Sequence, residues 1–332
     1  MKKVKIIAEV GINHNGSLKN ALKLVAEAKK AEADYVKFQI FKAHNVVTKE
    51  ACKANYQKSN FKDKETQYQM IKKFELSFDK FKIIKKECLK YKIKFLCSVF
   101  DIESLEYLKK LREKIIKIPS GEITNFPLIQ EIGRMNIKVI MSTGMSNYKE
   151  INEAIKLLTK NGTKKKNIYL LHCNTAYPTP PCDVNLPKLK VLEKKFGVKV
   201  GYSDHTLGIE IPIAAVCFGA TIIEKHLTID KKLSGPDHKN SLKPKEFLTM
   251  VRSIRNTEKA LTALKRSISF SEKSNVKVVR KSIVAREKIF KGEIFTELNL
   301  TTKRPGSGKN PMKWEKIIGK KATKDYLKDE FI

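Results

Sequence analysis

Eight short, apolar, β-rich segments follow one another along most of this chain, with helix-like segments between them. The strand-like segments are Lys5–Val10, Asp34–Gln39, Ile93–Phe100, Lys114–Ile118, Lys138–Ser142, Asn167–Cys173, Lys199–Ser203 and Thr221–His226. Amphipathic stretches fill most of the gaps, among them Leu18–Ala31, Phe78–Tyr91, Ile102–Arg112, Lys149–Leu158 and Lys188–Lys195. Eight strands alternating with helices predict an α/β fold, a (β/α)8 TIM barrel of about 250 residues.

A doubly wound sheet is the alternative to a barrel. It has fewer strands as a rule and places a glycine-rich GxGxxG fingerprint after the first one. Here the first strand runs into Gly11-Ile12-Asn13-His14-Asn15-Gly16, which does not have that pattern. The long gap between the second and third strands, about residues 40–92, predicts an extended active-site loop.

The last part of the chain has a different pattern. We expect the barrel to occupy residues 1–265 and a helix, Lys243–Leu264, to close it. A polar linker is predicted at residues 266–279, followed by a small, mainly β domain at residues 280–332. About fifty residues make a small core, so we expect this domain to dock on the barrel or on a partner subunit.

The 332 residues carry 68 Lys and Arg against 35 Asp and Glu, a formal net charge of +33. The excess is nearly all lysine, spread along the chain without arginine clusters or interleaved aromatic residues. Nucleic-acid readers depend on those features, so a basic nucleic-acid-binding protein is the less favoured hypothesis. The charge should instead concentrate anionic substrates near the protein.

Two further classes of protein are disfavoured by the sequence. No apolar run approaches the ~18–20 residues of a membrane span, and Met1-Lys2-Lys3 leads straight into a strand rather than a signal peptide. We therefore expect a cytoplasmic protein without membrane contacts. Six cysteines show no CxxC pair, which favours free thiols over zinc ligands or disulfides.

Polar side chains gather at the carboxyl ends of the predicted strands, where barrel enzymes carry their active sites. They are Glu9, Lys37, Gln39, Ser98, Lys117, Ser120, Glu122, Ser142, His172, Ser203, Asp204, His205 and His226. Each buried polar group costs free energy unless it is paired, so a scaffold without a site would not accumulate them. The pattern predicts an active site at this end of the barrel.

His205 and His226 end the seventh and eighth strands, which are neighbours in a barrel. Their imidazoles could converge on one divalent metal and leave other positions open to water or substrate. Two hydrogen-bonded structural histidines are the alternative, and we favour the metal for the pair. His172 could be a structural residue at its strand end.

Lys37 and Lys117 each lie within a strand, where a charge is otherwise penalised. Their ammonium groups could bind a phosphate or carboxylate, although either one could instead extend to the rim of the barrel. Ser120, Ser142 and Ser203 could add hydroxyl donors to the same anion site.

The candidate acid/base carboxylates are Glu9 and Glu122, with ion pairs to the two lysines as the alternative role. Asp204 could orient the neighbouring His205. Asp237 lies on the loop after the eighth strand, where it could contact substrate hydroxyls or simply belong to a turn.

These motifs resemble the sialic acid synthase family. The resemblance rests on Ala8-Glu9-Val10-Gly11-Ile12-Asn13-His14-Asn15-Gly16, Val36-Lys37-Phe38-Gln39, Lys117-Ile118-Pro119-Ser120-Gly121-Glu122, Ser142-Thr143-Gly144-Met145, Tyr177-Pro178-Thr179-Pro180, Gly201-Tyr202-Ser203-Asp204-His205-Thr206, Ile223-Glu224-Lys225-His226 and Ser234-Gly235-Pro236-Asp237-His238. Thr301-Thr302-Lys303-Arg304-Pro305-Gly306 is similar to the antifreeze-like (SAF) domain that ends members of the family. The resemblance runs in order along essentially the whole chain.

The resemblance implies a condensation of phosphoenolpyruvate with an N-acetylmannosamine-type sugar, which gives a nine-carbon 2-keto acid and phosphate. It implies Mn2+ or Mg2+ as the cofactor and a domain-swapped homodimer. By position in the motifs, His205 and His226 match the metal ligands, and Glu9 and Glu122 match the active-site carboxylates. Lys37, Lys117, Ser120, Ser142 and Ser203 match the groups around phosphoenolpyruvate. Gln39, Tyr177 and Asp237 match sugar contacts, and Arg304 matches a residue that reaches the partner subunit's sugar.

One motif departs from the family pattern, since Cys97-Ser98-Val99-Phe100 stands where relatives usually have Ser-Thr-Pro-Phe. The sequence favours N-acetylneuraminate as the product only slightly over N,N'-diacetyllegionaminate, and both over pseudaminate. The segments around Tyr56-Gln57 and Gln67-Tyr68-Gln69 are expected to decide between them. A related barrel enzyme acting on a phosphorylated sugar would need a second phosphate site and would lack the antifreeze-like tail.

Overall fold

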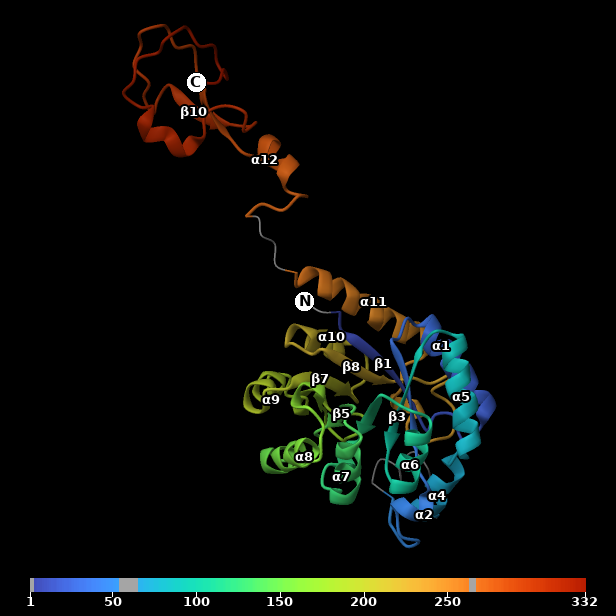
Figure 1. Cartoon of the computed structure of the whole chain (residues 1–332). Helices are drawn as coiled ribbons and strands as arrows, with labels where there is room; N and C mark the ends of the chain where they lie inside the picture. Colours follow the sequence, from blue (N-terminus) through green and yellow to red (C-terminus); the bar gives the residue numbers. More distant parts are fainter. Residues whose placement is uncertain (1–2, 54–64, 263–266) are drawn as a thin grey trace. The chain divides into compact units, whose positions relative to one another are not determined.

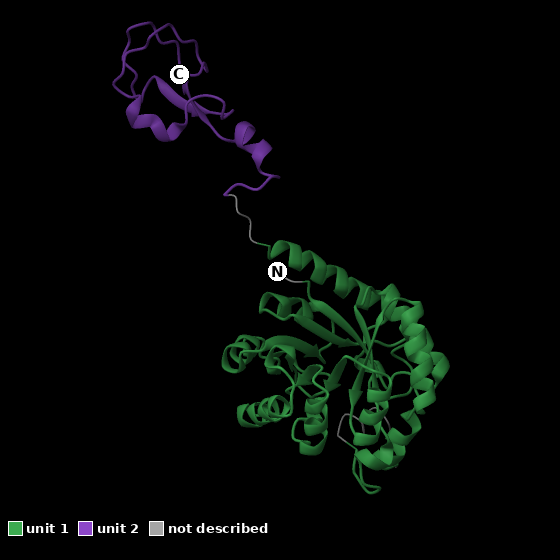
Figure 2. Ribbon diagram, viewed as in Figure 1, with its two compact units in different colours: residues 1–262 green, residues 263–332 purple. Residues whose placement is uncertain are grey.

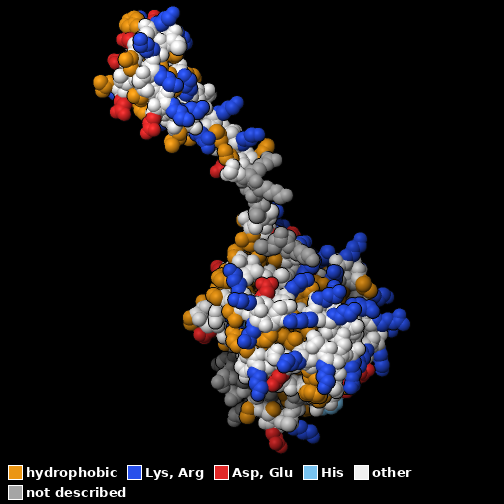
Figure 3. All heavy atoms as spheres, turned by 60° about the vertical axis from the view of Figure 1, so that its left-hand side comes forward, with side chains coloured by type: hydrophobic (Ala, Val, Ile, Leu, Met, Phe, Trp, Pro, Cys, Tyr) orange, Lys and Arg blue, Asp and Glu red, His pale blue; other side chains and the backbone are white. Residues whose placement is uncertain are grey.

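The computed structural model describes residues 3–53, 65–262 and 267–332. The chain divides into two compact units, Met1–Thr262 and Ala263–Ile332 (Figure 2), called unit 1 and unit 2 below. Within the described ranges, no helix is both long and apolar enough to cross a membrane. Lysine and arginine side chains are dispersed over the face of the molecule in Figure 3, with acidic and apolar side chains between them.

Unit 1 is a closed barrel of eight parallel strands, as the alternation of segments predicts (Figure 1). The strands are β1 (Lys5–Gly11), β2 (Tyr35–Ile40), β3 (Lys94–Val99), β4 (Ile115–Ile118), β5 (Lys138–Ser142), β6 (Ile168–His172), β7 (Lys199–Asp204) and β8 (Ile222–His226). Pairing of Lys5 with Ile222 and of Glu9 with His226 joins β1 to β8 and closes the barrel.

Helices surround the barrel, and four of those named below begin at a residue whose side chain caps the first turn. The surrounding helices are α1 (Leu18–Lys30), α5 (Phe78–Lys90), α6 (Ile102–Lys110), α7 (Phe126–Arg134), α8 (Tyr148–Lys160), α9 (Lys188–Phe196), α10 (Glu210–Cys217) and α11 (Pro244–Ala260). Ser17, Asp101, Asn125 and Asn147 each accept a backbone N–H of the first turn of α1, α6, α7 and α8, respectively. Such caps satisfy donors that have no partner within the helix.

The alternation of side chains along each strand separates two cores. Residues such as Val36, Phe38 and Ile40 of β2 point outward and join the large core beneath the helices. The inward positions near the middle of the barrel hold Ile7, Leu96, Ile140, Leu171 and Ile222, which form a separate small core. Because side chains two residues apart share a face of a strand, the inward positions beyond this core bring polar groups to the carboxyl ends.

Among its described residues, the long gap after β2 contains two short helices before α5. They are α2 (Ala43–Val46) and α4 (Gln67–Phe74), and α4 begins at a capping box formed by Thr66 and Gln69. Met70 and Phe74 are buried in a cluster with Ile12 and Phe41. The gap is therefore partly helical, while Tyr56 and Gln57 lie outside the described residues.

Unit 2 is a small domain with its own core. Strand β9 (Ser282–Ala285) pairs antiparallel with β10 (Leu300–Lys303). Buried Ile283, Ile289, Phe295 and Leu300 pack together inside it. Helix α12 (Lys273–Val279) lies within the stretch that the sequence predicts as a linker, and the division between the units falls after Thr262. The segment 266–279 contains four serines and its apolar residues do not recur regularly at helical spacing, so the sequence gives no clear helical pattern there.

Candidate active site

A cavity of about 600 Å³ opens at the carboxyl ends of the barrel strands. Most of the predicted site residues line it, namely Glu9, Lys37, Gln39, Lys117, Ser120, Ser142, Tyr177, Ser203, His205, His226 and Asp237. These residues come from strands far apart in the sequence and meet because the barrel is closed. The cavity therefore lies at the carboxyl ends of the strands, where the sequence predicts the active site.

Lys37 lies at the centre of a buried ionic cluster. Its Nζ is 3.3 Å from Oε2 of Glu9, 3.1 Å from Oε1 of Glu224 and 3.0 Å from Oγ of Ser98. Burial disfavours the charge of Lys37, but the carboxylates of Glu224 and Glu9 outweigh it and raise the pKa of the lysine. Lys37 is a permanent cation at the floor of the cavity.

Lys117 lies beside this cluster and pairs with no carboxylate of the described residues. Its Nζ donates to Oγ of Ser142 at 2.6 Å and to the carbonyl of Ile118 at 3.3 Å. Burial lowers the pKa of Lys117 to about 8, the nearby charge of Lys37 lowers it further, and Glu224 opposes the shift. An incoming anion would supply the missing negative charge, so Lys117 is prepared to bind one.

Glu224 is the functional residue that sequence reasoning missed. It is buried, and it accepts a hydrogen bond from Ser203 at 2.9 Å in addition to its ion pair with Lys37. Burial alone would raise the pKa of this carboxyl, but Lys37 and Lys117 hold it at about 2. The signal was available: Glu224 lies two residues before His226 on β8, so the two side chains share the inward face.

Glu9 and Asp237 are carboxyls of a different kind. Burial raises the pKa of Glu9, despite the opposing charge of Lys37, and Gln39 donates to its Oε1 at 3.3 Å. Burial, with the charge of Glu9, raises the pKa of Asp237 to about 7. The cavity thus combines one firmly ionised carboxylate, Glu224, with two that hold a proton more readily. Carboxyls of unlike pKa at one site suit acid/base chemistry.

The two predicted metal ligands lie next to each other, with ring centroids 5.7 Å apart. His205 donates from Nδ1 to the carbonyl of Asn174, which leaves Nε2 as an acceptor, 2.9 Å from the hydroxyl of Tyr177. The Nδ1 atom of His226 has no hydrogen-bond partner among the described residues. Burial lowers the pKa of His205 to about 4 and that of His226 well below its ordinary value. Both rings are therefore neutral at pH 7.

Neutral imidazoles with one ring nitrogen fixed by a backbone carbonyl have the form that metal ligands take. His205 fits that description, and the buried, unpartnered nitrogen of His226 shows that its ring is not held by a protein hydrogen bond there. No group of three or more His, Cys, Asp or Glu residues within the described ranges has metal-ligand geometry. The residues present fit a two-imidazole site whose remaining positions go to water or substrate oxygens.

Two predicted residues are placed differently, and a third lies in unit 2. Glu122 does not line the cavity, and its carboxylate accepts a hydrogen bond from Asn125 at 2.6 Å, at the start of α7. Asp204 does not contact His205 and instead pairs with Lys225 on the outer face of the barrel. Arg304 is an exposed residue of unit 2, directly after β10.

Two further strand ends, those of β6 and β3, complete the comparison with the predicted residues. Nε2 of His172 lies 2.6 Å from the carbonyl of Val184, as expected of a structural histidine. At the segment that departs from the family pattern, Ser98 binds Lys37 and Phe100 lines the cavity. The departure thus keeps a hydroxyl in contact with the lysine.

Comparison with known proteins identifies the family. The sequence profile of the NeuB family matches residues 24–266, and that of the SAF domain matches residues 280–332. The chain belongs to the NeuB family. It is 50% identical over 332 residues to the N,N'-diacetyllegionaminic acid synthase of Campylobacter jejuni, covering 100% of this chain and 99% of that one. It is 42% identical over 316 residues to the enzyme of the same name from Legionella pneumophila, covering 95% of this chain and 89% of the other.

Among solved structures, the chain is similar to an N-acetylneuraminic acid synthetase from Leptospira borgpetersenii. The TM-score is 0.72 at 33% identity, over 83% of this chain and 90% of that one. Synthases of the NeuB family condense phosphoenolpyruvate with an amino sugar and form a C–C bond. The protein is therefore an enzyme of this type, a barrel synthase with a C-terminal SAF domain.

Proposed function

We propose that this protein is an N,N'-diacetyllegionaminate synthase. The reaction joins phosphoenolpyruvate, water and 2,4-diacetamido-2,4,6-trideoxymannose to give the nine-carbon 2-keto acid and phosphate. The observation that carries the chemistry is the cavity itself, where two buried lysines, three carboxyls and two imidazoles meet. Phosphoenolpyruvate needs cationic partners for its phosphate and carboxylate, and the aldehyde of the sugar needs a site that polarises its oxygen.

Two observations favour the deoxy sugar over N-acetylmannosamine, to which the sequence motifs alone lean slightly. The two relatives compared above that bear the legionaminate name match 95% or more of this chain. One side of the cavity is also apolar and includes Val46, Met70, Ile71 and Phe100. A 6-methyl group is stabilised in such surroundings, whereas a 6-hydroxyl would have to give up its hydrogen bonds to water.

The basic side of the cavity is suited to phosphoenolpyruvate. Lys117, which has no carboxylate partner among the described residues, and Lys37 would hold its phosphate and carboxylate, with hydroxyls of Ser142 and Ser203 beside them. In the reaction, C3 of phosphoenolpyruvate bonds to the aldehyde carbon of the open-chain sugar, and positive charge develops at C2. Glu224, which stays ionised, would stabilise that charge.

Water then has to add to C2, and its proton needs an acceptor. Glu9 lies across Lys37 from Glu224 and has a raised pKa, so it is the better proton acceptor of the two. The tetrahedral adduct loses phosphate through cleavage of the C2–O bond, which leaves the 2-keto acid. Mn2+ or Mg2+, held by His205 and His226, would supply Lewis-acid polarisation of the sugar aldehyde.

The deciding experiment measures phosphate release from phosphoenolpyruvate with Mn2+ and each of the two sugars. We expect a higher kcat/KM with 2,4-diacetamido-2,4,6-trideoxymannose. A higher value with N-acetylmannosamine would make the protein an N-acetylneuraminate synthase with the same site residues. Release with neither sugar would contradict the assignment.

We also propose that the enzyme acts as a homodimer in which Arg304 contributes to the sugar site of the partner subunit. This follows from the position of Arg304 in the motif of the SAF domain, and its exposure leaves the guanidinium available for such a contact. A guanidinium in the site would bind an acetamido oxygen.

A further inference from the structure

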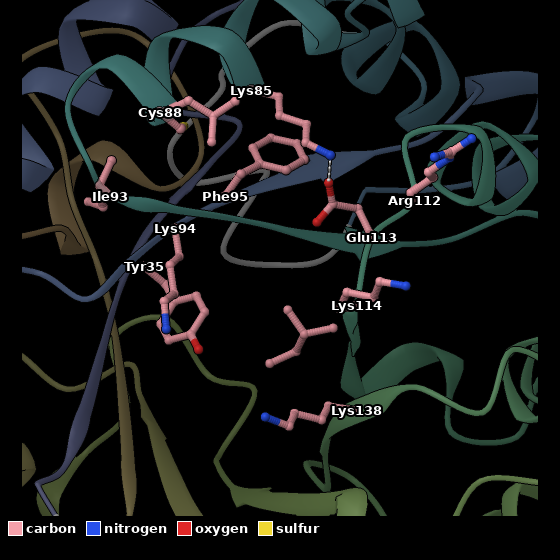
Figure 4. Close-up of a pocket in the computed structure, with 12 residues that line it drawn as sticks. Tyr35, Lys85, Cys88, Ile93, Lys94, Phe95, Arg112, Glu113, Lys114 and Lys138 are labelled. Atoms are coloured by element: carbon pink, nitrogen blue, oxygen red, sulfur yellow. Dashed lines mark ion pairs between the residues drawn. The ribbon is translucent and has the colours of Figure 1, made fainter.

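A second cavity, of about 390 Å³, lies at the opposite end of the barrel from the active site. It is lined by the amino-terminal ends of β2, β3, β4 and β5 and by part of α5 (Figure 4). Its volume is within the range of small-molecule sites. We call it the basic cavity, because five of its side chains are cations: Lys85, Lys94, Arg112, Lys114 and Lys138.

The positive charge of the basic cavity is not balanced. Glu113 is the one carboxylate among its lining residues, and it pairs with Lys85 (Figure 4). Within the part of the chain that the structure describes, no ion pair involves Lys94, Lys114 or Lys138. Asp34, which directly precedes β2, pairs with Arg255 at 3.2 Å. Like charges in one concave site repel one another, and an anion would relieve that repulsion.

The lysines follow a regular arrangement in the barrel. The first residues of β1, β3, β5 and β7 are Lys5, Lys94, Lys138 and Lys199. In three of these strands the residue two positions later belongs to the inner core, so these first residues share the inward face. Alternate strands of a barrel contribute side chains to one layer of its interior. The layer at the amino-terminal end of this barrel is therefore formed by the four lysines.

Tyrosines lie between these lysines. Lys94 Nζ is 5.4 Å from the ring centre of Tyr35, and Lys199 Nζ is 5.4 Å from that of Tyr169. Burial raises the pKa of Tyr35, while the charges of Lys5 and Lys138 act on its hydroxyl in the opposite direction. The charges of Lys5 and Lys138, which come from separate strands, thus both act on the hydroxyl of Tyr35.

The basic cavity also has an apolar side. Cys88 and Ile93 lie on one side of the view in Figure 4, and Lys114 and Lys138 lie on the other. Tyr35 and Ile115 line the same space; both are partly exposed and pack against the inner core, on the face of the strands that also carries Lys94 and Lys138. A ligand that fills this cavity needs an anionic part for the lysines and an apolar, preferably flat, part for Tyr35 and Ile115.

We propose that the basic cavity binds a nucleoside phosphate, with the phosphates on Lys94, Lys114 and Lys138 and the base against Tyr35 and Ile115. Lysine binds phosphate as a point charge, and aromatic or aliphatic side chains stabilise the face of a base. The site is separate from the active site, because the same strands present Lys37, Ser98 and Ser142 at their other ends.

The test is isothermal titration calorimetry of the full-length protein with ATP, inorganic triphosphate and adenosine. We expect ATP to bind more tightly than either of the other two. In the triple variant Lys94→Gln, Lys114→Gln and Lys138→Gln, the Kd for ATP should rise about tenfold or more, the equivalent of 1.4 kcal/mol. These side chains are exposed, so the variant should fold.

A matched control removes the same charge elsewhere. Lys19, Lys23 and Lys149 are exposed helix residues away from both cavities, and their replacement by Gln should change the Kd by less than about twofold, since screened distant charges contribute little. Equal weakening in both triple variants, or triphosphate binding as tightly as ATP, would overturn the proposal. So would an absence of ATP binding, or its loss in Lys117→Met, which would place the nucleotide in the active site.

Discussion

Lys225 and Asp204 form an ion pair in which neither side chain is exposed to solvent. Each residue directly precedes one of the two neighbouring histidines, His226 and His205. The ammonium group of Lys225 also donates to the carbonyl of Thr206, and Asp204 accepts from the backbone and hydroxyl of Thr206. The pair therefore ties the ends of β7 and β8 together from outside the barrel and fixes the two imidazoles relative to each other.

Breaking this ion pair should destabilise unit 1 strongly. Removal of one partner leaves a buried charge uncompensated, which costs about 3–5 kcal/mol, so Asp204→Asn and Lys225→Met should each lower the free energy of unfolding measured in urea. The double variant should recover part of the loss, because no charge then stays buried alone. A double variant less stable than both single variants would contradict this account.

Glu224 should matter more for turnover than Glu122. Glu224→Gln keeps the shape of the side chain and removes the charge beside Lys37, and we expect kcat to fall roughly 10²–10⁴-fold, the range typical of acid/base and electrostatic groups. Glu122→Gln is the control, since Glu122 contacts Asn125 and does not line the cavity. Phosphate release under saturating substrates measures both. A larger effect at Glu122 would return the catalytic role to that residue.

The two histidines should be required for metal binding in the folded protein. His205→Ala and His226→Ala each remove one of the two imidazole ligands, so we expect at least about tenfold weaker Mn2+ binding, detectable by electron paramagnetic resonance of free Mn2+. Circular dichroism should show an unchanged fold. Chelation of the wild-type enzyme should abolish phosphate release, and Mn2+ should restore it. Unchanged Mn2+ affinity in both variants would remove these residues as ligands.

Acid should destabilise the protein through His14. This side chain is fully buried, accepts a hydrogen bond from the backbone N–H of Gly16, and has a pKa lowered to about 4, chiefly by burial. Because the folded state holds the neutral ring, stability is complete above the unfolded pKa of about 6.5 and is lost as the pH falls toward 4. By pH 5 the loss from this group should be about 2 kcal/mol. Urea unfolding at pH 7 and pH 5 measures it, and His14→Gln should show a smaller decrease.

The proposed exchange of Arg304 between subunits can be tested by mixing variants. If Arg304 acts in the partner's site, Arg304→Ala and His205→Ala homodimers should both be inactive. Heterodimers formed after joint refolding should regain about a quarter to a half of the activity, because one of their two sites is intact. Phosphate release of the mixture measures the recovery. Recovery absent from a mixture shown to contain heterodimers would place Arg304 in its own subunit's site, or in none.

The sequence determined the strands of the barrel and the face of each strand on which a residue lies, because both depend on local periodicity. Eight β-rich segments predicted the barrel, and their bounds differ from those of the observed strands by at most one residue at either end. The order of residues along each strand also determined which polar groups reach its carboxyl end. Lys37, Lys117, His205 and His226 could therefore be assigned to the site, because their positions follow from a two-residue repeat.

The tertiary structure decided which charged side chains pair with each other. Among the described residues, Lys37 gained two carboxylate partners and Lys117 none, which raises the pKa of Lys37 and leaves that of Lys117 lowered to about 8. Asp204 was expected beside His205, but the outward direction of its side chain pairs it with Lys225. These contacts join residues on different strands, and that between Lys37 and Glu224 exists only because the barrel closes, a long-range event that no local pattern encodes.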